Sequence, residues 1–161
     1  MEEKVLIIDF GSQYTQLIAR RLRDLGVFSE IYPYTKYRDI INQDAVKGVI
    51  LSGGPSSVFD DGAPIVEMDL LECGKPVLGI CYGMQLMSQI LGGAIVSSDK
   101  REYGHAEIKL LNESKLFTDS PESQNVWMSH GDCVDILPSG FKAIAKSGSI
   151  SHAAIIDENR D

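Results

Sequence analysis

The sequence predicts an α/β fold of the flavodoxin-like kind, with an open, mostly parallel sheet, flanking helices and an antiparallel extension. Three short apolar runs, at residues 5–8, 48–51 and 77–80, are typical of strands buried on both faces of a sheet. Segments of helical periodicity separate these runs, as in βαβ units. The second half carries short strands divided by turn residues, which predict the antiparallel extension.

The first half alternates strands with helices. A further β-rich segment at residues 27–32 ends at Pro33. Pro64 lies near the start of one helical segment, and glycine follows three of them, where it commonly ends a helix. The expected helices cover residues 14–25, 37–42, 64–73 and 82–91.

The second half changes to a pattern of period two. Ala106, Ile108 and Leu110 alternate with charged residues, as in a strand with one face in water. No internal repeat and no clear linker interrupts the chain, so residues 1–161 are expected to form one domain. Further short strands are expected at residues 126–128, 142–145 and 153–156.

Composition limits the classes of function. The net charge of −8 argues against non-specific nucleic-acid binding, and Arg20, Arg21 and Arg23 are best explained as a solvated helix face. No apolar run reaches membrane-spanning length, and no signal peptide precedes the first strand. Three cysteines without a dense framework suit a reducing compartment, and no metal-ligand spacing is present. We therefore expect a cytoplasmic protein that binds no nucleic acid, membrane or metal.

The most informative segment is Gly79-Ile80-Cys81-Tyr82-Gly83, which joins the third apolar run to a helix. A side chain at such a strand–turn–helix elbow is exposed at the carboxyl end of the sheet. The flanking glycines lack Cβ atoms and so permit a tight turn. The helix dipole stabilises a thiolate at this position. Cys81 is the candidate nucleophile, and the alternative is a buried structural cysteine.

Loops that follow the buried strands are expected to meet at the edge where open α/β sheets bind ligands. They are residues 9–13, residues 52–55 and the Cys81 elbow. The Tyr82 N–H and an N–H of the Gly53-Gly54 turn would then stabilise an oxyanion. Alternatively, residues 52–55 form an ordinary tight turn or a phosphate-binding loop like that of ATP pyrophosphatases, although Pro55 removes one N–H donor from such a loop.

The general base is harder to assign. A cysteine nucleophile normally needs a histidine that a carboxylate orients. The chain offers His105, His130 and His152, and none has a carboxylate at an informative spacing. His130 lies in residues 127–132, which predict a strand end and a turn. The residues thus predict a nucleophile and an oxyanion hole but no base.

Five motifs occur in order along the chain. The elbow fits the pattern G-x-C-x-G-x-Q at residues 79–85. The others are Asp-Phe-Gly-Ser-Gln-Tyr-Thr-Gln at 9–16, Leu-Ser-Gly-Gly-Pro at 51–55, Arg-Glu-Tyr-Gly at 101–104 and Val-Trp-Met-Ser-His-Gly-Asp at 126–132. Together they resemble class I glutamine amidotransferases and, within that family, the amidotransferase domains of GMP synthases. The resemblance spans nearly the whole chain.

The resemblance implies roles for individual residues. Cys81 would attack the side-chain amide of glutamine and form a glutamyl thioester. Gly54 and Tyr82 would donate backbone N–H groups to the oxyanion, and Gln85 would help to hold the substrate. The amino-acid end of glutamine would be bound by Ser129, His130, Gly131 and Asp132. No cofactor is implied for this domain itself.

The resemblance also implies a partner, and the sequence differs from the family pattern in one respect. An ATP pyrophosphatase domain or subunit would use the ammonia, with ATP and Mg²⁺, to convert xanthosine monophosphate to GMP, and a homodimer of the complete enzyme fits the family. The family carries its catalytic histidine and glutamate in a His-Pro-Glu segment, and no His-Pro-Glu occurs here. We therefore expect a C-terminally incomplete amidotransferase domain with an unpaired sheet edge, an exposed apolar face and little activity alone.

Two alternatives remain open. An amidotransferase of anthranilate or carbamoyl phosphate synthesis would share the elbow, although the motifs at residues 9–16 and 126–132 argue against it. A non-catalytic flavodoxin-like binding domain would explain the missing His-Pro-Glu segment, but the intact cysteine elbow opposes it.

Overall fold

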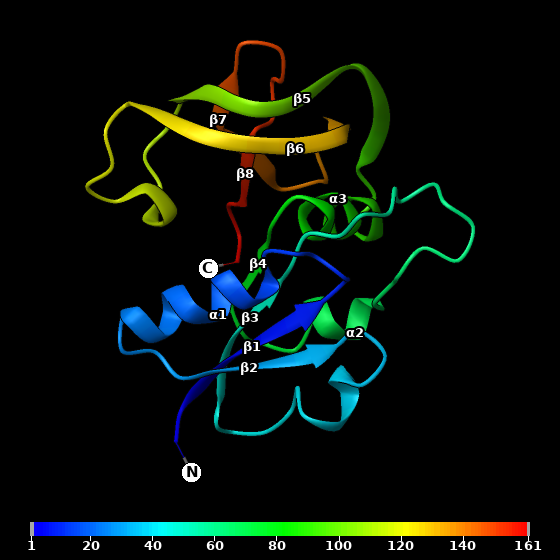
Figure 1. Ribbon diagram of the computed structural model, residues 1–161, viewed down its shortest axis with the longest axis vertical. Helices are drawn as coiled ribbons and strands as arrows, with labels where there is room; N and C mark the ends of the chain where they lie inside the picture. The colour runs from blue at the N-terminus through cyan, green and yellow to red at the C-terminus, as the bar shows by residue number, and fades with distance from the viewer. Residues whose placement is uncertain (1, 161) are drawn as a thin grey trace. The chain divides into compact units, whose positions relative to one another are not determined.

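The computed structural model describes residues 2–160, apart from the side chains of residues 98–103 and His130. The chain forms two compact units, Met1–Ile90 and Leu91–Asp161, called here the N-terminal and the C-terminal unit. The N-terminal unit contains a parallel sheet with helices, and the C-terminal unit contains an antiparallel sheet (Figure 1). This is the α/β fold with an antiparallel extension that the sequence predicts.

The N-terminal unit is built around a four-stranded parallel sheet in the order β2-β1-β3-β4. The two central strands carry the core, where Leu6, Ile8 and Leu51 are fully buried. The apolar runs at residues 5–8 and 48–51 therefore lie at the centre of the sheet, as predicted. The prediction is wrong for the run at residues 77–80, which lies at the edge of the sheet and is only partly buried. The strands are β1 (Lys4–Asp9), β2 (Ser29–Pro33), β3 (Val46–Leu51) and β4 (Val77–Gly79).

Helices follow the strands of this unit in turn. α1 packs Ala19 against Ile7 and Ile50 of the sheet, because its apolar residues recur on one face. The expected helix at residues 37–42 is a single 3₁₀ turn. The helices are α1 (Thr15–Asp24), η1 (Tyr37–Asp39), α2 (Met68–Leu71) and α3 (Tyr82–Ile90).

The helix expected over residues 64–73 is much shorter in the structure, where α2 covers only Met68–Leu71. Two tyrosine hydroxyls bind the backbone that precedes it. The Tyr82 hydroxyl donates to the Pro64 carbonyl at 2.5 Å, and the Glu67 N–H donates to the Tyr37 hydroxyl at 3.2 Å. These long-range bonds hold the segment in an extended path, so local propensity does not decide its conformation.

The C-terminal unit is a four-stranded antiparallel sheet in the order β6-β5-β7-β8. Its buried core includes Ile108, Val134 and Ile144. The strands are β5 (Ala94–Leu110), β6 (Ser123–Ile136), β7 (Phe141–Ser147) and β8 (Ala154–Asp157), with a 3₁₀ turn η2 (Lys115–Phe117) between β5 and β6.

Two strands of this unit are far longer than predicted. The pattern at residues 106–110 is only the end of the 17-residue β5, and residues 126–128 are only part of the 14-residue β6. Pairing between β5 and β6 extends both strands across polar sequence, where no apolar alternation marks them. Strand length is set here by a partner that is remote in the sequence.

The edge of the parallel sheet is formed by a short strand. β4 pairs with β3 and is the last strand of that sheet in the described part of the chain. Leu78 and Ile80 are each 37% exposed to solvent. β4 thus presents an open edge and apolar side chains next to the elbow.

Candidate active site

Cys81 lies at the junction of β4 and α3, in a strained backbone conformation. Its φ is +50°, and among the described residues only Asp119 is another non-glycine residue with positive φ. Such a conformation is rare for a residue with a Cβ atom, and it is typical of nucleophile elbows. The side chain is half-buried.

The two glycines that flank Cys81 are required for a specific steric reason. A Cβ on Gly79 would lie 2.7 Å from the Met84 nitrogen. A Cβ on Gly83 would collide with the carbonyl oxygen of Leu51. The first turn of α3 therefore lies directly on the ends of β3 and β4, and any larger residue would force these elements apart.

Backbone hydrogen bonds hold the elbow against β3. The Ile80 N–H donates to the Leu51 carbonyl at 2.9 Å, and the Gly83 N–H donates to the Ser52 carbonyl at 3.1 Å. The Gln85 N–H donates to the Cys81 carbonyl at 3.0 Å, so α3 begins immediately after the cysteine. The thiol therefore lies at the N-terminus of a nine-residue helix, whose dipole stabilises a negative charge there.

The turn after β3 lies beside the elbow. A Cβ on Gly53 would be 3.6 Å from the Cβ of Cys81, and a Cβ on Gly54 would be 2.8 Å from the Phe10 carbonyl oxygen. In the described part of the chain, neither the Gly54 N–H nor the Tyr82 N–H has a hydrogen-bond acceptor. Both backbone donors belong to segments that adjoin Cys81.

The Tyr82 side chain stabilises the surroundings of the elbow. Its ring packs edge-on against Phe10 at a centroid distance of 5.3 Å, and its hydroxyl donates to the Pro64 carbonyl. Burial is the largest cause that raises the pKa of Tyr82 to about 12. The phenol is thus a neutral donor, which ties residues 64–67 to the first turn of α3.

The remaining candidate residues fall into both units. Gln85 is buried in α3 of the N-terminal unit. In the C-terminal unit Ser129 is exposed, Gly131 half-buried and Asp132 buried, while the side chain of His130 lies outside the described residues.

The turn expected at residues 127–132 is wrong, because these residues continue within β6. The neighbouring strand β5 is irregular opposite these residues. It has more residues than β6 between the pairs Ser97–Asp132 and Glu102–His130, which is a bulge in the ladder. This irregularity depends on pairing with a remote strand, which the local sequence pattern does not reveal.

Neither of the two histidines with described side chains meets a carboxylate. His152 contacts the Val134 carbonyl through Nδ1 at 2.9 Å, which is a structural role. His105 is exposed and packs its ring edge-on against Trp127 at 5.0 Å. The described side chains therefore supply no histidine–carboxylate pair.

Ser52 is the functional candidate that sequence patterns do not identify. It is fully buried at the end of β3, and its hydroxyl accepts a hydrogen bond from the Phe10 N–H at 3.1 Å. The same hydroxyl donates to the Gly53 carbonyl at 2.8 Å. The one sequence signal for Ser52 is its position, because it is a polar residue between an apolar run and two glycines.

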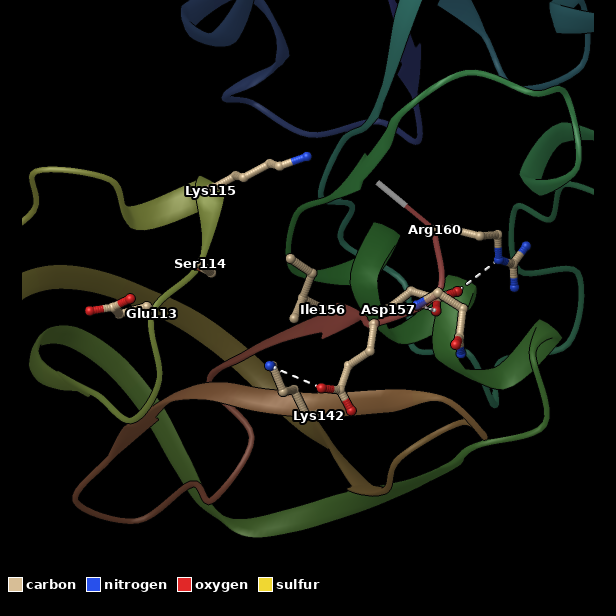
Figure 2. A pocket seen from close by; sticks show the side chains of 9 residues that line it. Glu113, Ser114, Lys115, Lys142, Ile156, Asp157 and Arg160 are labelled. Carbon is tan, nitrogen blue, oxygen red and sulfur yellow. Dashed lines mark hydrogen bonds and ion pairs between the residues drawn. The ribbon is translucent and has the colours of Figure 1, made fainter.

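A separate hollow of about 390 Å³ lies in the C-terminal unit (Figure 2). Two ion pairs cross it: Lys142 with Glu158 at 3.0 Å and Arg160 with Asp157 at 2.7 Å. Four of its charged side chains are therefore paired with one another, and none of the predicted site residues lines it. Among the described residues no group of side chains could hold a metal ion, and no helix is long and apolar enough to span a membrane.

Comparison with known families decides the class of protein. The model of the family "Glutamine amidotransferase class-I" matches residues 6–161. The chain belongs to the class I glutamine amidotransferase family. A solved glutamine amidotransferase from Thermotoga maritima shares the fold, with a TM-score of 0.78 and 20% identity over 98% of this chain and 73% of that one.

More similar relatives point to one branch of the class I amidotransferases. The chain is 50% identical over 159 residues to a glutamine-hydrolysing GMP synthase of Brachyspira hyodysenteriae, and 51% identical over 156 residues to one of Desulfotalea psychrophila. These matches cover 99% and 96% of this chain, but it spans only 31% and 30% of the two relatives. A solved protein from Thermoplasma acidophilum, described as a candidate GMP synthase subunit, has a TM-score of 0.84 and 27% identity, over 99% of this chain and 80% of that one.

Proposed function

We propose that this chain is the glutamine-hydrolysing domain of a GMP synthase. The observation that carries the proposal is the Cys81 elbow, with its positive φ, its two sterically required glycines and the Gly53-Gly54 turn beside it. Identity of about half the residues with glutamine-hydrolysing GMP synthases supports this branch.

In the proposed reaction the Cys81 thiolate adds to the side-chain amide carbon of glutamine. The Gly54 and Tyr82 N–H groups bind the oxyanion that forms. The C–N bond then breaks, the leaving nitrogen takes a proton and departs as ammonia, and a glutamyl thioester remains. Water hydrolyses that thioester to glutamate and restores the thiol.

Binding of glutamine is assigned to the residues for which the family resemblance implies this role. Gln85 helps to hold the substrate, and the segment from Ser129 to Asp132, which includes His130, binds its amino-acid end. The glutaminase step needs no cofactor. Its proton transfers need a base that the described side chains do not provide, so we expect the chain alone to be inactive or weakly active.

The ammonia is used by a second domain or subunit. An ATP pyrophosphatase domain would adenylate xanthosine monophosphate with ATP and Mg²⁺ and then release GMP and AMP. The chain spans about a third of its GMP synthase relatives, which leaves room for such a domain. We place the enzyme in the cytoplasm. The family resemblance also fits a homodimer of the complete enzyme.

The proposed nucleophile can be tested by selective labelling. A glutamine analogue with a chloromethyl ketone in place of the amide should attach to Cys81 alone, with one label per chain, and excess glutamine should slow it. Cys81→Ala should abolish labelling, and peptide mass spectrometry locates the label. Equal labelling of Cys73, Cys81 and Cys133 would contradict a poised nucleophile and favour a non-catalytic domain.

A further inference from the structure

We propose that Ser52 is a positioning residue that aims the Gly54 N–H at the oxyanion. The inference rests on the proposed function, since it concerns the oxyanion hole of the Cys81 reaction. In this proposal the buried Ser52 side chain orients the Gly54 N–H. The Gly54 N–H contacts the substrate, and Ser52 itself does not.

The Ser52 hydroxyl is buried and makes one hydrogen bond as an acceptor and one as a donor. It is 0% exposed, it accepts from the Phe10 N–H at 3.1 Å, and it donates its proton to the Gly53 carbonyl at 2.8 Å. A hydroxyl carries one proton, so the bond to Gly53 uses its only donor. Ser52 therefore connects the end of β1 to the turn that follows β3.

Peptide geometry transmits this bond to Gly54. The Gly53 C=O and the Gly54 N–H belong to the same peptide unit, and the described chain contains no cis peptide. In a planar trans peptide these two groups point in opposite directions. With the carbonyl held on the buried side by Ser52, the Gly54 N–H must face the other way, and it has no acceptor among the described residues.

The two glycines make such a restraint necessary. Gly54 has no room for a Cβ, which would lie 2.8 Å from the Phe10 carbonyl oxygen, and Gly53 lies against Cys81. Glycine permits this close approach but also gives the backbone its widest freedom. A peptide between two glycines could rotate and turn its N–H away from the oxyanion, and the Ser52 hydroxyl opposes that rotation.

Ser52 also fixes the turn relative to the nucleophile. Its carbonyl accepts the Gly83 N–H at 3.1 Å, in the turn that carries Cys81. One residue thus joins the elbow through its backbone and the Gly53-Gly54 peptide through its side chain. Ser52 therefore helps to set the distance between the nucleophile and the oxyanion donor, together with the bond from Ile80 to Leu51.

The experiment compares two electrophiles at Cys81. The glutamine chloromethyl ketone reacts through addition to its carbonyl, which forms an oxyanion, before sulfur displaces chloride. Iodoacetamide reacts by direct displacement of iodide and forms no oxyanion at its carbonyl. The rate constant for the chloromethyl ketone at saturation, divided by that for iodoacetamide at Cys81, therefore reports on the oxyanion hole. The ratio cancels changes in the reactivity of the thiol itself.

We expect Ser52→Ala to lower this ratio by about 10- to 100-fold, somewhat less than the loss of a whole oxyanion donor. The matched control is Ser88→Ala, because Ser88 is also 0% exposed but its hydroxyl donates to the Met84 carbonyl, at 2.8 Å within α3. Its ratio should stay at the wild-type value. If circular dichroism shows that Ser52→Ala is unfolded, Ser52→Cys keeps the shape with a weaker donor and should give an intermediate ratio.

A wild-type ratio in the folded Ser52 variant would overturn the inference and leave the proposed function standing. A wild-type chain whose Cys81 reacts with the chloromethyl ketone no faster than Cys73 and Cys133 would overturn the proposed function, and the inference with it.

Discussion

The N-terminal and C-terminal units use their residues in different ways. In the N-terminal unit the candidate chemistry is built from backbone: a strained φ at Cys81, N–H donors at Gly54 and Tyr82, and glycines that allow close approach. In the C-terminal unit the candidate residues are side chains along β6, such as the exposed Ser129 and the buried Asp132. Under the proposed function, backbone groups carry the reaction and side chains of β6 bind the substrate.

This difference predicts how each unit responds to mutation. Backbone geometry fixed by steric contact fails when one methyl group is added, because the neighbouring backbone has no room to yield. Side chains on a regular strand can be exchanged without displacing the strand. Substitutions that separate loss of folding from loss of substrate binding therefore test this difference between the two units.

The largest effect is expected at Gly83. Gly83→Ala should lower the free energy of unfolding by about 3 kcal/mol, because its Cβ would collide with the Leu51 carbonyl. Gly48→Ala is the control, since a Cβ there would make an ordinary contact 3.7 Å from the Pro76 oxygen. Urea denaturation measures both. Similar stability of the two variants would mean that the elbow is not sterically locked.

A smaller effect is expected at Asp132 in the C-terminal unit. Asp132→Asn should raise the half-saturating concentration of the glutamine chloromethyl ketone about tenfold, which corresponds to about 1.4 kcal/mol of binding free energy. The rate of Cys81 labelling by iodoacetamide should stay unchanged, because the elbow is intact. Asp135→Asn is the control, since Asp135 is exposed on the same strand. If both variants bind the analogue like wild type, β6 does not select the substrate.

The smallest effect is expected at Tyr82. Tyr82→Phe should cost about 1 kcal/mol of stability, because it removes the hydrogen bond to the Pro64 carbonyl. The folded state raises the pKa of this phenol from 10.0 to about 12, mainly by burial. Stability from this group is fully present below pH 10 and is lost as the pH rises towards about 12.

Denaturation at a series of alkaline pH values checks this prediction. The wild-type free energy of unfolding should fall more steeply than that of Tyr82→Phe above pH 10, the ordinary pKa of the phenol. Parallel curves for the two proteins would show that the Tyr82 phenol does not link pH to folding.

The sequence predicts the N-terminal unit well because its signals are local. Buried parallel strands read as unbroken apolar runs, and the elbow shows itself through Gly79, Cys81 and Gly83. The shortened α2 escapes prediction because the hydroxyls of Tyr37 and Tyr82 reach it from distant positions in the chain. Bonds between remote residues leave no periodic pattern.

The C-terminal unit and Ser52 show the limits of local patterns more clearly. The length of β5 and the bulge opposite residues 130–132 arise from pairing with β6. Ser52 looks like any serine in a turn, and its importance follows from the position of Phe10 at the end of a neighbouring strand. Such contacts depend on tertiary structure and can be found only when the strands are brought together.

The central claim is that Cys81 releases ammonia from glutamine for a synthetase partner. The most direct test compares GMP formation from xanthosine monophosphate, with glutamine or with ammonium as the nitrogen donor, in the enzyme that contains this chain. Cys81→Ala should abolish the glutamine-dependent reaction and spare the ammonium-dependent one, because the thiol is needed only to release ammonia. Loss of both activities, or retention of both, would contradict the assignment of Cys81 as the nucleophile.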